Sequence, residues 1–226
     1  MIEAIIFDFD GTLVDSRENL LGFYEELFGL FGVRQPEWRE PSIEKAVQGR
    51  SIPDVLECYV ADERVRDLMW QHVCNLDYVE VTVGLDLEPF ARECVADLSP
   101  DYPLAVATNR THDMDEVIRH FELDGHLKTV LTAGQVERPK PSPDLLLEAA
   151  ALLRVQPARV LYVGDTPLDH EAAVRAGMPF LLYDRLQTTA LHSSGYAPRL
   201  TDFRHLRPML RRYKDRWPGT PARRPL

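Results

Sequence analysis

The chain opens with Ile2-Glu3-Ala4-Ile5-Ile6-Phe7-Asp8-Phe9-Asp10-Gly11-Thr12-Leu13-Val14-Asp15-Ser16. Residues 2–8 form a short apolar run that ends in a carboxylate, and its length and branched side chains predict a buried strand. Asp8 and Asp10 then follow the carboxyl end of that strand. Gly11 lets the chain turn sharply beneath them. The stretch therefore predicts a strand that brings two carboxylates to one edge of a sheet.

Segments similar to this strand alternate with helical patterns along the rest of the chain. The strand-like segments span residues 103–108, 127–132, 159–164 and 179–183. Helical patterns span residues 87–98, 111–121, 142–153, 167–176 and 202–213. Pro143 is expected at the first helical position of one helix, and Gly177 just after the end of another. The alternation predicts parallel βαβ units, and therefore an α/β fold with a doubly wound parallel sheet.

Residues 16–85 interrupt this alternation. Apolar residues at helical spacing, including an aromatic group between residues 23 and 31, predict helices with a core of their own. Turn signals separate these helices, and residues 79–83 are predicted to be the returning linker. We therefore expect a discontinuous α/β core of residues 1–15 and 86–226, with a helical insert at residues 16–85.

Composition limits the class of partner. The 226 residues include 36 Asp and Glu against 26 Lys and Arg, and the net charge of −10 argues against nucleic-acid binding through a general positive field. No apolar run approaches the roughly 20 residues that span a bilayer, and the N-terminus shows no signal-peptide pattern. We expect a cytoplasmic protein with no membrane partner and with its three cysteines reduced. A monomer and a homodimer both stay open.

Polar residues follow the predicted strands at the edge where an open parallel sheet binds its ligands. These candidates are Asp8, Asp10, Thr108, Asn109, Lys140, Asp165 and Asp169. Carboxylates gathered at one edge raise the pKa of each other and repel. A hard divalent cation with oxygen ligands, Mg²⁺, relieves that repulsion and admits an anionic substrate.

These residue types suit phosphoryl transfer. A carboxylate such as Asp8 beside Mg²⁺ is a nucleophile at phosphorus and would form an aspartyl-phosphate. Asp10 can protonate the leaving alkoxide and later deprotonate water. Lys140 supplies a compact positive charge, and Thr108 a hydroxyl donor, for phosphoryl oxygens. Plainer explanations exist for single residues: Asp169, for example, also fits a first-turn acid favoured by the helix dipole.

Four motifs in this order resemble those of the haloacid dehalogenase superfamily of hydrolases, in particular its phosphoglycolate-phosphatase-like group. The motifs are Asp8-Phe9-Asp10-Gly11-Thr12, Thr108-Asn109, Lys140 in Arg138-Pro139-Lys140-Pro141-Ser142, and Gly164-Asp165-Thr166-Pro167-Leu168-Asp169. The resemblance covers roughly residues 1–184. It implies a Rossmann-like core, with the helical insert at the position of the family's cap domain.

The resemblance also implies a role for each motif residue. Asp8 would be the nucleophile and a metal ligand, and Asp10 would be the acid/base, with its backbone carbonyl also binding the metal. Thr108, Asn109 and Lys140 would bind phosphate. Asp165 would bind Mg²⁺ directly, and Asp169 would support the metal or Lys140. One departure from the family is Arg110, where relatives often have Lys, and we expect its side chain to point outward. Arg50 lies in a turn of the insert and would read a substrate carboxylate or a second phosphate. A solvated arginine explains Arg50 equally well.

The expected activity is Mg²⁺-dependent hydrolysis of a small phosphorylated metabolite. The resemblance implies 2-phosphoglycolate as the default substrate, while nucleotides, sugar phosphates and pyrophosphate stay open. A sugar phosphomutase would need the same Asp8 and Asp10. A dehalogenase attacks carbon and does not need Asp10, and a phosphonatase needs a cap lysine, for which only Lys45 is available. A non-catalytic binding protein would be marked by loss of Asp8, Asp10 or Lys140, and none of them is lost.

Overall fold

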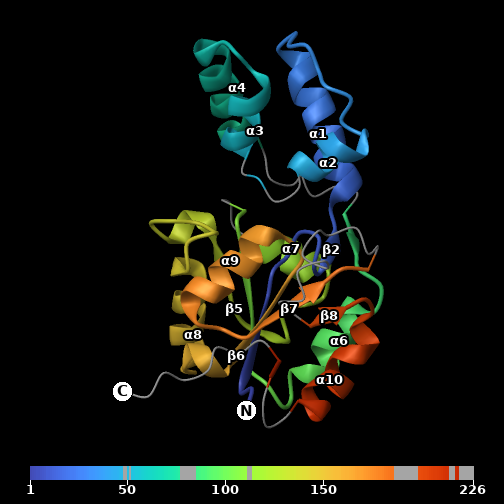
Figure 1. Cartoon of the computed structure of the whole chain (residues 1–226), viewed down its shortest axis with the longest axis vertical. Coiled ribbons are helices and arrows are strands. Elements are labelled where there is room, and N and C mark those ends of the chain that lie inside the picture. The colour runs from blue at the N-terminus through green and yellow to red at the C-terminus, as the bar shows by residue number, and fades with distance from the viewer. Residues whose placement is uncertain are drawn as a thin grey trace. The chain divides into compact units, whose positions relative to one another are not determined.

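A computed structural model describes residues 1–47, 50, 52–76, 85–110, 114–185, 198–213 and 217–218. The chain divides into two compact units. One unit combines Met1–Asp15 with Leu87–Leu226, and the other is Ser16–Asp86. The first is α/β and the second is helical (Figure 1).

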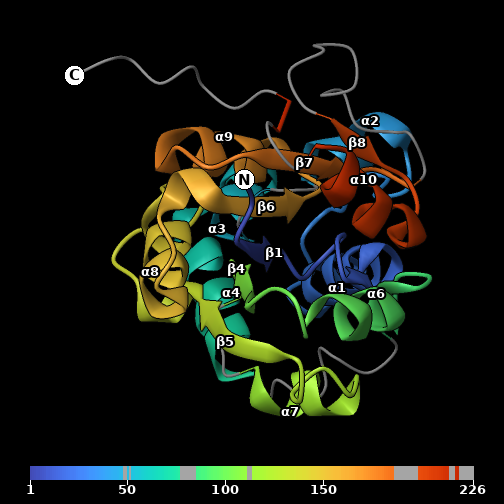
Figure 2. The same ribbon diagram turned by 90° about the horizontal axis from the view of Figure 1, so that it is seen from below.

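A parallel sheet of six strands forms the centre of the first unit. Its order is β5-β4-β1-β6-β7-β8, and each neighbouring pair is parallel (Figure 2). The strands are β1 (Ala4–Phe7), β4 (Leu104–Thr108), β5 (Leu127–Thr132), β6 (Val160–Gly164), β7 (Phe180–Tyr183) and β8 (Arg199–Leu200). The predicted doubly wound parallel sheet is confirmed. Two further short strands, β2 (Val14–Asp15) and β3 (Asp86–Leu87), form a separate two-stranded sheet.

Both faces of the large sheet are covered, which explains why its central strands are buried at every position. All four residues of β1 are buried. On one face, Ala4 and Ile6 join a hydrophobic cluster with the helices α8 (Asp144–Leu153) and α9 (Pro167–Ala176). On the other face, the ring of Phe7 lies 6.3 Å from that of Phe203. Figure 1 shows α8 and α9 on one side of the strands, and α6 (Ala91–Leu98) and α10 (Leu206–Arg212) on the other.

The helices of this unit begin within four residues, and end within one residue, of the bounds that the sequence patterns predict. They are α6 (Ala91–Leu98), α7 (Asp115–His120), α8 (Asp144–Leu153), α9 (Pro167–Ala176) and α10 (Leu206–Arg212). Pro143 is the N-cap of α8, one position before the predicted one, because Ser142 forms a turn in which its N–H donates to the Pro139 carbonyl. Residues 86–87 pair as β3, so α6 begins later than residue 87. Gly177 ends α9 with φ +68°, as predicted.

The second unit is a small helical body with its own core. Its helices are α1 (Arg17–Leu30), α2 (Pro41–Val47), α3 (Ile52–Tyr59) and α4 (Glu63–Asn75). Tyr24 and Phe28 pack around the indole of Trp38, with ring centroids 5.1 and 4.9 Å away. The predicted linker at residues 79–83 lies outside the described residues. In the described part of the chain, no helix combines the length and the apolar character needed to cross a membrane.

Candidate active site

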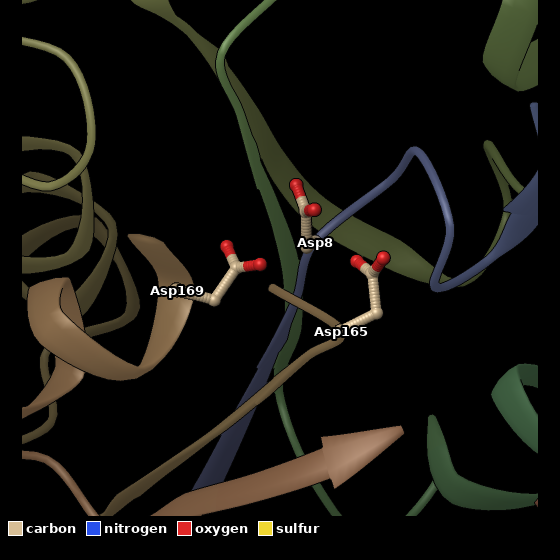
Figure 3. A group of neighbouring side chains, drawn as sticks. All are labelled: Asp8, Asp165 and Asp169. Carbon is tan, nitrogen blue, oxygen red and sulfur yellow. The ribbon is translucent and has the colours of Figure 1, made fainter. Parts of the chain in front are cut away.

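Three carboxylates meet at the carboxyl edge of the sheet. Asp8 follows β1 and Asp165 follows β6, which are neighbouring parallel strands, and Asp169 lies in the first turn of α9. One oxygen from each lies within 4.8 Å of the others, and Figure 3 shows the three groups converging. The backbone N–H of Asp8 still donates to the carbonyl of Val163, 2.8 Å away, so the sheet ladder itself sets the position of Asp8.

The turn after β1 brings Gly11 against Asp165. Gly11 has φ +75°, and a Cβ added to it would lie 2.2 Å from Oδ2 of Asp165. Only glycine combines this backbone conformation with so close an approach. The next residue, Thr12, is buried and donates its hydroxyl proton to Oδ1 of Asp165 over 3.1 Å. Gly11 and Thr12 therefore hold the Asp165 carboxylate in place.

Lys140 is buried between two of the carboxylates. Its Nζ donates to Oδ1 of Asp8 and to Oδ1 of Asp169, each over 2.7 Å, and to the hydroxyl of Tyr162 over 3.0 Å. The residue is only 6% exposed, so its ammonium is held in a low-dielectric site by two charged partners. The sequence prediction placed Lys140 at this edge, and the structure brings it directly to Asp8.

Tyr162 is a site residue that the sequence prediction missed. Its hydroxyl donates to Oδ1 of Asp169 over 2.6 Å from the buried strand β6. The only signal was a hydroxyl inside the apolar run Leu161-Tyr162-Val163, two residues before Gly164. A buried hydroxyl needs a partner, and Tyr162 finds it at the site.

Asp169 is saturated by protein donors. Thr166 donates to its Oδ2 from the backbone N–H over 3.0 Å and from the hydroxyl over 2.5 Å, while the Asp169 N–H returns a bond to Thr166. This is the capping box of α9. With Lys140 and Tyr162 on Oδ1, both oxygens of Asp169 already accept hydrogen bonds. The geometry suits a residue that orients Lys140.

The pKa values of Asp8 and Asp165 are strongly raised, whereas that of Asp169 is lowered. Burial raises the pKa of Asp8 to about 7, with repulsion from Asp169 adding to the rise and Lys140 opposing it. Burial, and then repulsion from Asp169 and Asp8, raises the pKa of Asp165 well above its usual value. Burial also acts to raise the pKa of Asp169, but the Lys140 ammonium and hydrogen bonds outweigh it, so this pKa is lowered.

These shifts fit a bound cation. Three carboxylates face one ammonium, so the fully ionised cluster carries an excess of negative charge in a buried place. A divalent ion with a preference for oxygen ligands would compensate that charge. Among the described residues, the side-chain hydrogen bonds to Asp8 go to Oδ1, which leaves Oδ2 for such an ion.

The second motif lies at the end of β4. Thr108 is buried, and its Oγ1 accepts the backbone N–H of Arg110 over 3.2 Å. The side-chain amide of Asn109 donates to the Lys140 carbonyl over 3.0 Å and accepts the Lys140 N–H over 2.9 Å. Asn109 therefore fixes the loop that carries Lys140, a contact that the sequence did not reveal.

The expectation that Arg110 points outward is wrong. Its Nε lies 2.6 Å from Oδ2 of Asp10, and its Nη2 lies 2.6 Å from Oδ1. The guanidinium also lies over the ring of Phe9, 5.3 Å from its centroid. A negative carboxylate and an aromatic face together hold the planar cation inward. Arg50, in contrast, belongs to the helical unit, where it is exposed and its Nη1 lies 2.8 Å from Sγ of Cys58.

Comparison with known proteins gives one family. The family model described as "Haloacid dehalogenase-like hydrolase" matches residues 5–183. A phosphoglycolate phosphatase of Rhodobacter capsulatus is 25% identical over 217 residues, which are 90% of this chain and 94% of the relative. A phosphoglycolate phosphatase of Escherichia coli K12 is 28% identical over 204 residues, with 79% of each chain covered.

Solved structures show the same fold. A subfamily IA HAD-superfamily hydrolase of Geobacter sulfurreducens matches with a TM-score of 0.72 and 29% identity, covering 92% of this chain and 96% of the other. A β-phosphoglucomutase of Clostridium difficile matches with the same TM-score at 20% identity, covering 91% and 93%. The second likeness extends to the fold alone.

Proposed function

This chain belongs to the haloacid dehalogenase-like hydrolase family, and we propose that it is a divalent-metal-dependent phosphatase of small phosphorylated metabolites. The observation that carries the proposal is the buried Lys140 bound to Oδ1 of Asp8, with Asp165 beside it. This arrangement presents a carboxylate as nucleophile and an ammonium for the phosphoryl oxygens. The relatives named phosphoglycolate phosphatase support the same enzyme class, the hydrolases of phosphoric monoesters, which the sequence also predicts.

The proposed reaction has two steps. An oxygen of Asp8 attacks phosphorus and forms an aspartyl-phosphate, while the bond from phosphorus to the ester oxygen breaks and Asp10 supplies the proton to that oxygen. A water oxygen then bonds to phosphorus, the bond to Asp8 breaks, and the water proton passes to Asp10. Thr108 and Lys140 bind the phosphoryl oxygens, with Asn109 holding Lys140 in place.

We propose Mg²⁺ as the cation. Asp8, Asp165 and the backbone carbonyl of Asp10 would hold it, and Asp169 would support the site by fixing Lys140. When bound, the ion neutralises charge on the phosphoryl group and draws the anionic substrate into an acidic site. The oxygen-only donor set favours Mg²⁺ over softer metals.

Mg²⁺ is expected to stabilise the protein more at pH 8 than at pH 5. The folded pKa of Asp8, about 7, lies above its value of about 3.9 in an unfolded chain. The metal-free fold therefore loses stability as pH rises between these two values, and the cation offsets the loss. At about 100 times its Kd, Mg²⁺ would stabilise by about 2.7 kcal/mol. The melting temperature measured with and without Mg²⁺ reports this stabilisation. In Asp165→Asn, Mg²⁺ should no longer raise the melting temperature. Equal shifts at both pH values contradict the assignment.

The helical unit is proposed as the cap that selects the substrate, with Arg50 reading a second anionic group such as the carboxylate of 2-phosphoglycolate. Arg50→Ala is then expected to raise KM about 10-fold for carboxylated or doubly charged phosphates, because a charge-assisted hydrogen bond contributes about 1.5–3 kcal/mol. KM for a simple alkyl phosphate should stay unchanged. Arg39→Ala is the matched control, since Arg39 is an exposed arginine of the same unit that pairs with Glu18 and Glu25. If Arg50→Ala changed KM by the same factor for both substrate types, Arg50 would not have this role.

A sugar phosphomutase is the second candidate, supported by the fold shared with β-phosphoglucomutase. Both reactions use the same nucleophile, so the products separate them. Incubation with Mg²⁺ and a panel of phosphate monoesters should release inorganic phosphate in amounts equal to the alcohol formed. Transfer between sugar hydroxyls with little free phosphate would favour the mutase. A wild-type protein inactive on the whole panel would favour a binding protein on a retired catalytic fold.

A further inference from the structure

The ion pair between Arg110 and Asp10 is built to a fixed geometry. Nε and Nη2 of the guanidinium each contact a different oxygen of the carboxylate. Such a two-point contact sets the distance and also the plane of the carboxylate. The side chain of Asp10 is 34% exposed, so burial alone does not fix its rotamer.

Arg110 is itself held at three places. Its guanidinium lies over the buried ring of Phe9, its N–H donates to Oγ1 of Thr108, and its carbonyl accepts the N–H of Ala133 over 2.8 Å. Its side chain is 13% exposed. These contacts fix the position of Arg110 before substrate binds, and Arg110 in turn fixes the position of Asp10.

Resting on the phosphatase function proposed above, we propose that Arg110 is a positioning residue that holds Asp10 as the base for hydrolysis of the aspartyl-phosphate. Each carboxylate oxygen offers two lone pairs, so Asp10 can accept from Arg110 and from a water molecule at once. In this step the water oxygen bonds to phosphorus, the bond between phosphorus and Asp8 breaks, and the water proton moves to Asp10. The ion pair stays closed until that proton arrives. Arg110 thereby favours release of phosphate over retention of a phosphorylated enzyme.

The test uses 4-nitrophenyl phosphate, whose leaving group needs no proton. With this ester, kcat/KM reports formation of the aspartyl-phosphate, and kcat can report its hydrolysis. Arg110→Ala is expected to lower the hydrolysis rate by about 10- to 100-fold, the cost of a misplaced catalytic group, while kcat/KM changes little. A burst of nitrophenol and trapped phosphoenzyme should then appear.

The matched control is Arg204→Ala. Arg204 also binds both oxygens of an aspartate, Asp202, and lies over an aromatic ring, that of Phe90, but takes no part in the site. This variant should leave kcat, kcat/KM and the burst unchanged. In an Asp10→Asn background, Arg110→Ala should add no further loss, because its effect passes through Asp10.

Equal falls in kcat and kcat/KM without phosphoenzyme, or an additive loss in the double variant, would overturn the positioning role. If Arg110→Ala does not fold, Arg110→Lys, which keeps the charge but not the two-point contact, must show a smaller loss confined to hydrolysis. Failure of the phosphatase function itself looks different, because the wild type would then release no phosphate at all.

Discussion

Lys140→Met is expected to abolish phosphate release and to destabilise the fold by about 3–5 kcal/mol, the usual cost of removing one partner from a buried ion pair. Lys140 is the ammonium that lies between Asp8 and Asp169. Methionine matches its length without its charge, so the loss is electrostatic more than steric. Activity should fall at least about 10²- to 10³-fold, because a preorganised group that stabilises transition-state charge is gone.

The destabilisation should depend on pH, with a sign that identifies its cause. In the wild type, Lys140 lowers the pKa of Asp169 and opposes the rise at Asp8. Without the ammonium, both folded pKa values rise, so the variant loses more stability than the wild type as pH rises above about 4. Urea unfolding at pH 5 and pH 8 should show the larger loss at pH 8. The exposed Lys128 provides a control, since Lys128→Met should change neither stability nor activity. A loss of equal size at both pH values would indicate a packing defect.

The strands and the convergence of the site were predictable because both follow from local pattern and sheet topology. Strands such as β1 and β6 are continuous apolar runs, since both faces of the sheet are covered. The carboxyl ends of neighbouring parallel strands necessarily lie together, so Asp8 and Asp165 meet. α9 was equally readable, because Pro167 begins it and Gly177 ends it.

What the sequence could not show are contacts between side chains from separate elements. Arg110 turns inward because its guanidinium pairs with Asp10 and lies over the ring of Phe9. Arg110 and Asp10 are 100 residues apart along the chain. The amide of Asn109 meets the backbone of Lys140 because β4 and the loop before α8 lie side by side. Such contacts leave no periodicity in a single sequence.

Asp8→Asn is expected to separate activity from stability most clearly. The proposed nucleophile is lost, so phosphate release should fall by about 10⁴-fold or more, the scale seen when a nucleophile is removed. Asparagine has the same shape, and its carbonyl oxygen can still accept the hydrogen bond that Lys140 gives to Oδ1. The change therefore removes the charge and the nucleophilic oxygen while leaving the local packing in place. Residual activity within 10-fold of the wild type would refute the assignment of Asp8 as nucleophile.

The same substitution should stabilise the metal-free fold at pH 8. Burial and repulsion raise the pKa of Asp8 to about 7, so its ionised form weakens the folded state above that pH. The neutral amide carries no such cost, and the melting temperature without Mg²⁺ should rise. At pH 4 the carboxyl is protonated in the folded wild type, and the difference should vanish. With Mg²⁺ at pH 8 the wild type should recover stability and Asp8→Asn should gain little, because one of the proposed ligands is missing. If Asp8 is a nucleophile that is held at an electrostatic cost, the variant must be inactive but more stable than the wild type. Loss of both activity and stability would assign Asp8 a structural role instead.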